Sequence, residues 1–214
     1  RKFTAIDLFS GCGGLTLGLK KAGFKVIGSV EINPLAVETY GKNHLGVKIW
    51  QKDIRRLTGA EILRTLGLKK GQLDLLAGCP PCQGFSRIRH HSEQDPRNDL
   101  LFEFLRIARV LRPKVILLEN VPGMVKDRRF FRFVKGIESC GYYCKWGVLN
   151  AADFNVPQRR RRLIVIGSRV GTVDLPSKKA TQRKQTVKEC IGELKTPVGN
   201  KDRLHRMYLN CTPR

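Results

Sequence analysis

Acidic residues are scarce in this sequence, and long apolar runs are absent from it. The 214 residues include 18 Asp and Glu against 41 Lys and Arg, which gives a formal net charge of +23. No run approaches the roughly 20 apolar residues that a membrane-spanning helix needs. The opening RKFTAIDLFS is charged and then strand-like, unlike a signal peptide. We therefore predict no membrane partner and a cytoplasmic location, in a prokaryotic cytoplasm or nucleoid.

The cysteine pattern argues against a metal site. The chain has seven cysteines, an odd number, and a single CxxC pair formed by Cys79 and Cys82. A zinc site would need a second CxxC or a spaced His pair, and His90 and His91 are adjacent. We predict no metal and reduced thiols in an intracellular compartment. The pair itself is compatible with a redox dithiol, a disulfide, or one nucleophile beside a structural neighbour.

The strong positive charge points to an anionic partner. Neutralisation of phosphates by Lys and Arg drives nucleic-acid binding, so nucleic acid is the first expectation. A solvated basic surface, an anionic membrane or an acidic protein would also account for the charge alone. The hydrophobic content of 41% is enough for a folded core, which makes wholesale disorder a poor explanation.

Short apolar runs alternate with segments of helical spacing along most of the chain. The predicted strands are residues 3–9, 25–31, 47–52, 73–78, 114–121, 142–150 and 161–170. The predicted helices are residues 15–23, 33–44, 99–113 and 129–141. This alternation predicts an α/β domain with a mostly parallel sheet covered by helices on both faces. Residues 1–168 would form this domain, and residues 169–214 would form a basic, exposed connector.

Polar or reactive residues follow five of the predicted strands. In open α/β sheets, ligands bind beyond the carboxyl ends of the strands, so these residues are candidates for one site. They are Phe9 with Gly11, Gly13 and Gly14, then Glu31, then Asp53, then Cys79 to Cys82, and finally Glu119 with Asn120.

The glycine cluster and Glu31 predict a nucleoside site. Glycines at a helix start let the backbone approach a ligand closely. A carboxylate about twenty residues later is where such folds hold ribose hydroxyls. The glycines are spaced more tightly than the GxGxxG of NAD enzymes, which suits a nucleoside without pyrophosphate, such as S-adenosylmethionine. A plain tight turn and a helix-start charge are the alternatives for these residues.

Cys82 is the predicted nucleophile of the CxxC pair. Cys79 ends an apolar strand and is expected to be buried, whereas Cys82 follows two prolines that stiffen its loop. Positive surroundings lower the pKa of a thiol and raise its thiolate fraction. Glu119 ends a later apolar strand, where desolvation favours a protonated carboxyl that can act as an acid. A structural carboxylate is the alternative for Glu119.

The QRRRR run at residues 158–162 is a dense cluster of guanidinium groups. Such a cluster binds phosphates or the polar edge of a base. Because the run abuts a predicted strand, alternation should place Arg160 and Arg162 on one face. A solvated charge run is the alternative.

Taken in order, these segments resemble the DNA cytosine-5 methyltransferase family. The matching segments are DLFSGCGGLTLGL, the glutamate of SVEINP, the aspartate of QKDI, GCPPCQGFS, DPRNDLLFEFLR, LLENV and QRRRRLIVIG, from about Phe3 to Gly167. The resemblance implies a Rossmann-like methyltransferase fold that uses S-adenosylmethionine. It also implies methyl transfer to carbon 5 of a cytosine flipped out of duplex DNA, through a covalent cysteine adduct.

The resemblance also implies roles for individual residues. The catalytic set would be Cys82, Glu119, Arg160 and Arg162. The cofactor pocket would be formed by Phe9, Gly11, Gly13, Gly14, Glu31, Ile32, Asp53, Ile54, Pro80 and Leu100, with Asp53 reading the adenine amino group. The substrate contacts would come from Pro81, Gln83, Ser86, Arg87, Arg89, Asn120 and Gln158, several of them on a loop that closes behind the flipped base.

The sequence departs from the family pattern after the arginine motif. The family continues with a target-recognition region and then C-terminal motifs, and neither is found here. A second polypeptide carrying them is the favoured explanation, as in split members of the family; truncation and a degenerate fragment are the others. The tRNA cytosine-5 methyltransferase branch, a non-catalytic DNA-binding subunit and an NAD-binding oxidoreductase are the competing functions.

Overall fold

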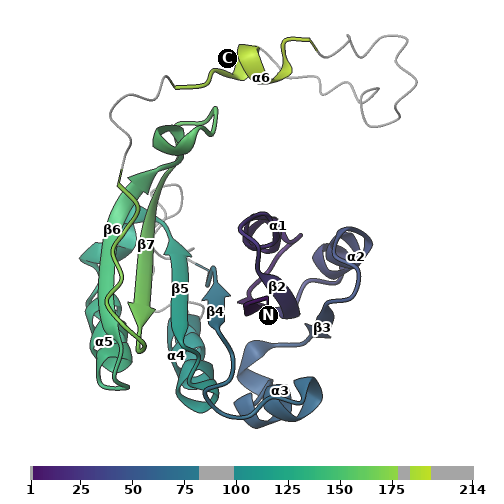
Figure 1. The fold of residues 1–214 in the computed structure, drawn as a ribbon, viewed down its shortest axis with the longest axis vertical. Coiled ribbons are helices and arrows are strands. Elements are labelled where there is room, and N and C mark those ends of the chain that lie inside the picture. Colours follow the sequence, from purple (N-terminus) through teal and green to yellow (C-terminus); the bar gives the residue numbers. More distant parts are fainter. Residues whose placement is uncertain (1, 82–98, 178–183, 194–214) are drawn as a thin grey trace. The chain divides into compact units, whose positions relative to one another are not determined.

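The computed structural model describes residues 2–81, 99–177 and 184–193 (Figure 1). The chain divides into two compact units. The first comprises the described residues of 1–149 together with Arg161–Ser177, and the second comprises Asn150–Arg160 with the described residues after 177. Residues 169–177 thus belong to the first unit. The predicted division of function between residues 1–168 and 169–214 stays a prediction.

Within the described residues, seven strands form one sheet in the order β3-β2-β1-β4-β5-β7-β6 (Figure 1). Their bounds are β1 Thr4–Leu8, β2 Lys25–Glu31, β3 Lys48–Gln51, β4 Leu75–Gly78, β5 Val115–Asn120, β6 Tyr143–Asn150 and β7 Arg161–Ser168. The pairs β1–β2, β1–β4, β2–β3 and β4–β5 are parallel, whereas β7 runs antiparallel to β5. The prediction of a mostly parallel sheet is confirmed, and the direction of β7 is a finding that the sequence did not predict.

The helices of the first unit connect these strands. Their bounds are α1 Gly14–Lys21, α2 Pro34–Asn43, α3 Gly59–Leu66, α4 Leu100–Leu111 and α5 Arg128–Glu138, with 3₁₀ turns η1 Ile54–Arg56 and η4 Pro122–Lys126. Asn33 caps α2 by accepting hydrogen bonds from the N–H groups of Leu35 and Ala36 at 2.9 and 3.2 Å, as its residue type predicted. The short helix α3 was not predicted, although Thr58 caps it through the N–H of Glu61 at 3.0 Å.

The two faces of the sheet are covered by different helices. Side chains alternate along a strand, so neighbours such as Ala5 and Ile6 of β1 point to opposite faces. Ile6 packs into the larger core, together with residues of α3, α4 and α5. Ala5 packs into a smaller core with Leu19 of α1. Both faces are therefore covered, as the α/β prediction required.

The second unit has little regular structure in its described part. It contains the 3₁₀ turn η5 Ala151–Phe154 and the short helix α6 Val187–Ile191. Thr186 and Glu189 form a capping box at the start of α6. Residues 184–193 are all exposed, which agrees with the predicted exposed character of this stretch.

Candidate active site

The carboxyl ends of the parallel strands meet along one edge of the sheet. Leu8, the last residue of β1, is in register with Val30 on one side and with Gly78 on the other. Gly78 is in turn in register with Leu118 of β5. The residues that follow β1, β2, β3, β4 and β5 are thereby brought to a common edge, as their positions in the sequence predicted.

Backbone donors from the loops after β1 and β2 surround the Glu31 carboxylate. Glu31 accepts hydrogen bonds from the N–H of Gly11 at 2.8 Å, of Ile32 at 2.9 Å and of Asn33 at 2.8 Å. Phe9 and Gly11 have positive φ values of 60° and 53°, which turn the chain sharply at the strand end. A Cβ on Gly11 would meet nothing within 4 Å, so the space beside this backbone is open.

Only glycine fits at position 13, because a side chain there would overlap neighbouring residues. Its φ is 94°, and a Cβ at this position would lie 2.2 Å from Nε2 of His44 and 2.9 Å from the Tyr40 ring. The His44 ring also lies 3.0 Å from the Gly13 carbonyl oxygen through Nε2. The sequence predicted a close approach of this backbone to a ligand, which stays a prediction; at Gly13 the structure shows a close approach to Tyr40 and His44 instead. Gly14 opens α1 with no atom within 4 Å of the Cβ position.

A buried polar cluster lies beneath the glycine loop and was not predicted. Asp7 of β1 is fully buried and accepts a hydrogen bond from the Thr16 hydroxyl at 2.7 Å. The Thr16 oxygen is also 2.8 Å from the Tyr40 hydroxyl. Burial raises the pKa of Asp7 to about 7, against an ordinary value of 3.8. A lone acidic residue inside the apolar run FTAIDLF was the signal that could have revealed this cluster.

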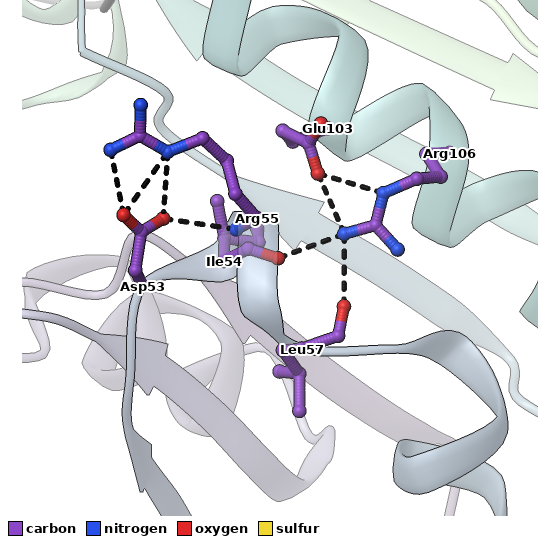
Figure 2. A network of polar contacts seen from close by, with 6 residues as sticks. All are labelled: Asp53, Ile54, Arg55, Leu57, Glu103 and Arg106. Atoms are coloured by element: carbon purple, nitrogen blue, oxygen red, sulfur yellow. Dashed lines mark hydrogen bonds and ion pairs between the residues drawn. The ribbon is translucent and has the colours of Figure 1, made fainter.

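Asp53 lies between β3 and η1, with its carboxylate held by Arg55 (Figure 2). The Arg55 guanidinium donates through Nη2 at 2.6 Å and through Nε at 3.0 Å to one oxygen, and the Arg55 N–H donates to the other at 3.0 Å. These hydrogen bonds from Arg55 lower the pKa of Asp53. Ile54, the next predicted pocket residue, is buried, and Leu100, at the start of α4, is partly buried.

Glu119 and Arg162 form an ion pair across β5 and β7. Nε of Arg162 lies 2.8 Å from Oε1 of Glu119, and the two side chains are 26% and 25% exposed. The pair forms because antiparallel register sets Glu119 opposite Ile164, and so places the start of β7 beside the end of β5. Glu119 is therefore only partly desolvated, with a cation beside it. The sequence had predicted both residues for the site without predicting their direct contact.

Asn120 connects the end of β5 to the loop that follows β4. Its amide nitrogen donates to the Pro80 carbonyl oxygen at 3.0 Å, and its amide oxygen accepts from the Val121 N–H at 2.8 Å. Asn120 is 2% exposed, so this link is shielded from water. Pro80 is buried and Cys79 is only partly buried, whereas full burial of Cys79 had been expected.

Several predicted site residues do not belong to the described part of the first unit. Cys82, Gln83, Ser86, Arg87 and Arg89 lie outside the described residues. Arg160 and Gln158 belong to the second unit, where the Arg160 N–H donates to the Asn150 side chain at 3.1 Å and the Gln158 N–H donates to the Val156 carbonyl at 2.7 Å. β7 begins at Arg161, so strand alternation does not place Arg160 on a face with Arg162.

Three further features bear on the predicted absences. Among the described residues, no group of His, Cys, Asp or Glu side chains is arranged to hold a metal ion. In the same part of the chain, no helix is long and apolar enough to cross a membrane. The five cysteines that the structure describes form no disulfide.

Comparison with known proteins gives consistent matches along the chain. The family described as C-5 cytosine-specific DNA methylase matches residues 3–212. The Type II methyltransferase M.XorII of Xanthomonas oryzae pv. oryzae is 38% identical over 194 residues, which cover 88% of this chain and 46% of that protein. The Type II methyltransferase M1.HphI of Haemophilus parahaemolyticus is 39% identical over 196 residues, covering 88% and 52%.

The chain thus spans about half the length of these curated relatives. It covers 72% of another, the Type II methyltransferase M.AquIA of Picosynechococcus, at 36% identity. Among solved structures, a DNA modification methyltransferase encoded within a prophage of E. coli has a TM-score of 0.76 and 31% identity, with 89% of this chain and 54% of that one covered. The Dnmt2 methyltransferase of S. pombe has a TM-score of 0.65 and 25% identity, covering 81% and 51%.

Proposed function

Because this chain belongs to the C-5 cytosine-specific DNA methylase family, we propose that the protein methylates carbon 5 of cytosine in duplex DNA. The observation that carries the proposal is the Glu119–Arg162 ion pair at the carboxyl edge of the sheet. Beside it, Asn120 holds the Pro80 carbonyl, two residues before Cys82. A carboxyl, a guanidinium and the Pro80 carbonyl thus lie at the end of β5, which supports the proposal.

The residues at the same edge fit a nucleoside cofactor. Three backbone N–H groups orient the Glu31 carboxylate, and a carboxylate offers about four acceptor positions, which leaves capacity for a ribose hydroxyl. Open space lies beside Gly11, and Ile32 is 60% exposed, so a flat base could cover it. We propose that S-adenosylmethionine binds here, with Asp53 at its adenine amino group. The cofactor supplies the methyl group.

In the proposed mechanism, the thiolate of Cys82 forms a bond to carbon 6 of the flipped cytosine. This attack places negative charge on the ring, and Glu119 relieves it by holding or donating a proton at ring nitrogen 3. Arg162 contacts the base carbonyl and keeps the Glu119 side chain in place. Carbon 5 becomes enamine-like and takes the methyl group of S-adenosylmethionine, which leaves as S-adenosylhomocysteine. Removal of the carbon 5 proton by a base then drives elimination: the bond from carbon 6 to sulfur breaks, Cys82 leaves as a thiolate, and ring nitrogen 3 returns its proton to Glu119.

The nucleophile can be tested by substitution and by trapping. We expect Cys82→Ala to abolish transfer of labelled methyl groups from S-adenosylmethionine to duplex DNA, and Cys79→Ala to retain it. A duplex containing 5-fluorocytosine should trap a covalent adduct on Cys82, because fluorine at carbon 5 cannot leave as a proton does. An adduct on Cys79, or methylation of tRNA with none of DNA, would overturn the proposal.

The Glu119 carboxyl can be tested separately. We expect Glu119→Gln to lower kcat by about 100-fold or more, which is the usual contribution of a positioned proton donor. Glu138→Gln, at an exposed position of α5, removes the same charge and should leave kcat unchanged. Single-turnover methylation of duplex DNA measures both. Equal rates for Glu119→Gln and the wild type would exclude this role.

Target recognition in a second polypeptide stays a prediction. The family relatives are about twice as long as the matched region, so the proposed activity depends on sequence beyond it. Native mass spectrometry of the protein isolated from its source would show whether a second chain is bound. Methylation assayed with and without that chain would then show whether it is required.

A further inference from the structure

The turn that carries Asp53 is held by a residue from a distant helix. Arg106 of α4 donates from Nη2 to the carbonyl oxygens of Ile54 at 2.8 Å and Leu57 at 2.9 Å (Figure 2). These partners lie 52 and 49 residues earlier in the chain. Within the turn, the Ile54 carbonyl already accepts from the Leu57 N–H at 3.1 Å. Arg106 adds a second donor there and also binds the Leu57 carbonyl, so one side chain bridges the start of the turn and the residue that follows it.

Glu103 orients the guanidinium that makes these contacts. Its Oε2 accepts from Nε of Arg106 at 2.7 Å and lies 2.6 Å from Nη2 (Figure 2). The side chains of Arg106 and Glu103 are 37% and 23% exposed, so water competes only partly for these hydrogen bonds. One planar group thus links a carboxylate on its own helix to the Ile54 carbonyl of η1 and to the carbonyl of Leu57, which follows η1. A lysine ammonium, which is a compact charge without a fixed fork, could not reproduce this geometry.

We propose that Arg106 is a positioning residue that holds the Asp53 carboxylate where it can accept a hydrogen bond from the adenine amino group. The inference rests on the proposed function, since it concerns the same cofactor pocket. Arg55 orients the carboxylate itself, and Arg106 orients the backbone that follows it. The Arg106 guanidinium is engaged with Glu103 and with backbone carbonyls, so it would act on the cofactor indirectly, through the turn that carries Asp53 and Ile54. Because α4 begins at Leu100, Arg106 also joins Asp53 to the element that carries another proposed pocket residue.

A comparison of two ligands separates positioning from general stability. S-adenosylhomocysteine carries the adenine amino group, and S-inosylhomocysteine carries a carbonyl oxygen in its place. Isothermal titration of each ligand into the full-length protein gives a preference, defined as the ratio of the two dissociation constants. We expect the wild type to prefer S-adenosylhomocysteine by at least about tenfold, because the inosyl carbonyl would leave Asp53 without its donor.

Substitutions then show which residues produce this ligand preference. Asp53→Asn should reduce it to nearly one. Arg106→Ala should reduce it to a similar value and raise KM for S-adenosylmethionine by about tenfold, with little change in kcat. Arg106→Lys keeps the charge but should not restore the preference. Arg109→Ala is the matched control, because Arg109 is exposed on the same helix and its loss should leave the preference unchanged.

Each outcome decides between the inference and its alternatives. The inference is wrong if the Arg106 variants weaken the binding of both ligands equally. It is also wrong if these variants keep the wild-type preference while Asp53→Asn loses it. In both cases the proposed function stands. If the wild type, titrated together with any second chain found bound to it, binds neither ligand, the proposed function is wrong and the inference fails with it. Should Arg106→Ala fail to fold, Arg106→Lys and Glu103→Gln carry the test, since each keeps an arginine-sized or glutamate-sized side chain.

Discussion

Asp7 is an acidic residue in a fully buried position, and the free-energy cost of burying its carboxyl depends on pH. The folded protein holds its proton up to a pKa of about 7, whereas an unfolded chain releases it near 3.8. Between these values folding takes up a proton, so the contribution of Asp7 to stability falls as pH rises from about 4 to about 7. Above this range the buried group is charged in both states and the cost is constant.

We predict that Asp7→Asn removes this dependence. Asparagine keeps an oxygen for the Thr16 hydroxyl but cannot ionise, so the variant should gain stability over the wild type by about 1.4 kcal/mol per pKa unit of the shift, reached near pH 7. Urea unfolding from pH 4 to pH 8 measures the difference. Asp174→Asn, at a side chain 85% exposed, is the control. Parallel curves for wild type and Asp7→Asn would contradict the expectation.

Individual side chains differed in how far the sequence predicted their surroundings. The Asn33 cap depends on atoms two and three residues away, and its residue type was sufficient to predict it. The contacts of Arg106 depend on a turn some fifty residues earlier, so no local pattern indicates them. The three-residue spacing of Glu103 and Arg106 is typical of an ion pair along one helix and says nothing of a distant turn.

In the loop from β1 to α1, Gly13 is the glycine whose replacement should cost the most stability. Gly13 has a positive φ, and a Cβ there would overlap His44 and Tyr40 of the neighbouring α2 segment. We predict that Gly13→Ala destabilises the protein by about 1–3 kcal/mol, through backbone strain and displacement of α2. Gly18→Ala in α1 should instead stabilise it by about 0.5–1 kcal/mol, because the Cβ meets open space and alanine favours a helix. Chemical denaturation distinguishes the two.

A second variant separates the two causes at Gly13. In a His44→Ala background the overlap with the imidazole is gone, while the φ of 94° still disfavours alanine. The penalty of Gly13→Ala should therefore shrink there without vanishing. An unchanged penalty would assign the whole effect to the backbone.

Strand and helix periodicity predicted most elements, but it did not indicate how the strands pair or in which direction they run. The strands β1 to β5 and helices α1, α2, α4 and α5 were all expected near their observed bounds. Helix α3 was not predicted, although it is as long as α1 and is opened by the Thr58 cap. The antiparallel direction of β7 is set by pairing with β5, and an apolar run such as LIVIG reads the same in either direction.

The charge of the whole chain should govern its affinity for DNA. With a net charge of +23, association with a duplex releases many condensed counterions. We predict that the affinity for duplex DNA falls by about 100-fold or more between 50 and 200 mM salt, whatever the sequence of the duplex. Fluorescence anisotropy measures this. The affinity for S-adenosylhomocysteine is the control and should change little, and a similar small change for DNA would contradict the prediction.

The antiparallel pairing of β7 has a consequence for how the protein is made. Arg162 leaves the ribosome about forty residues after Glu119, a delay of roughly two to eight seconds at ordinary translation rates. During that interval β5 has no β7 beside it, and the guanidinium that pairs with Glu119 does not yet exist. A nascent chain therefore contains Cys82, Glu119 and the proposed cofactor residues before it can form the complete pair. We therefore expect newly made protein to lack the proposed methylation activity until the sheet is finished.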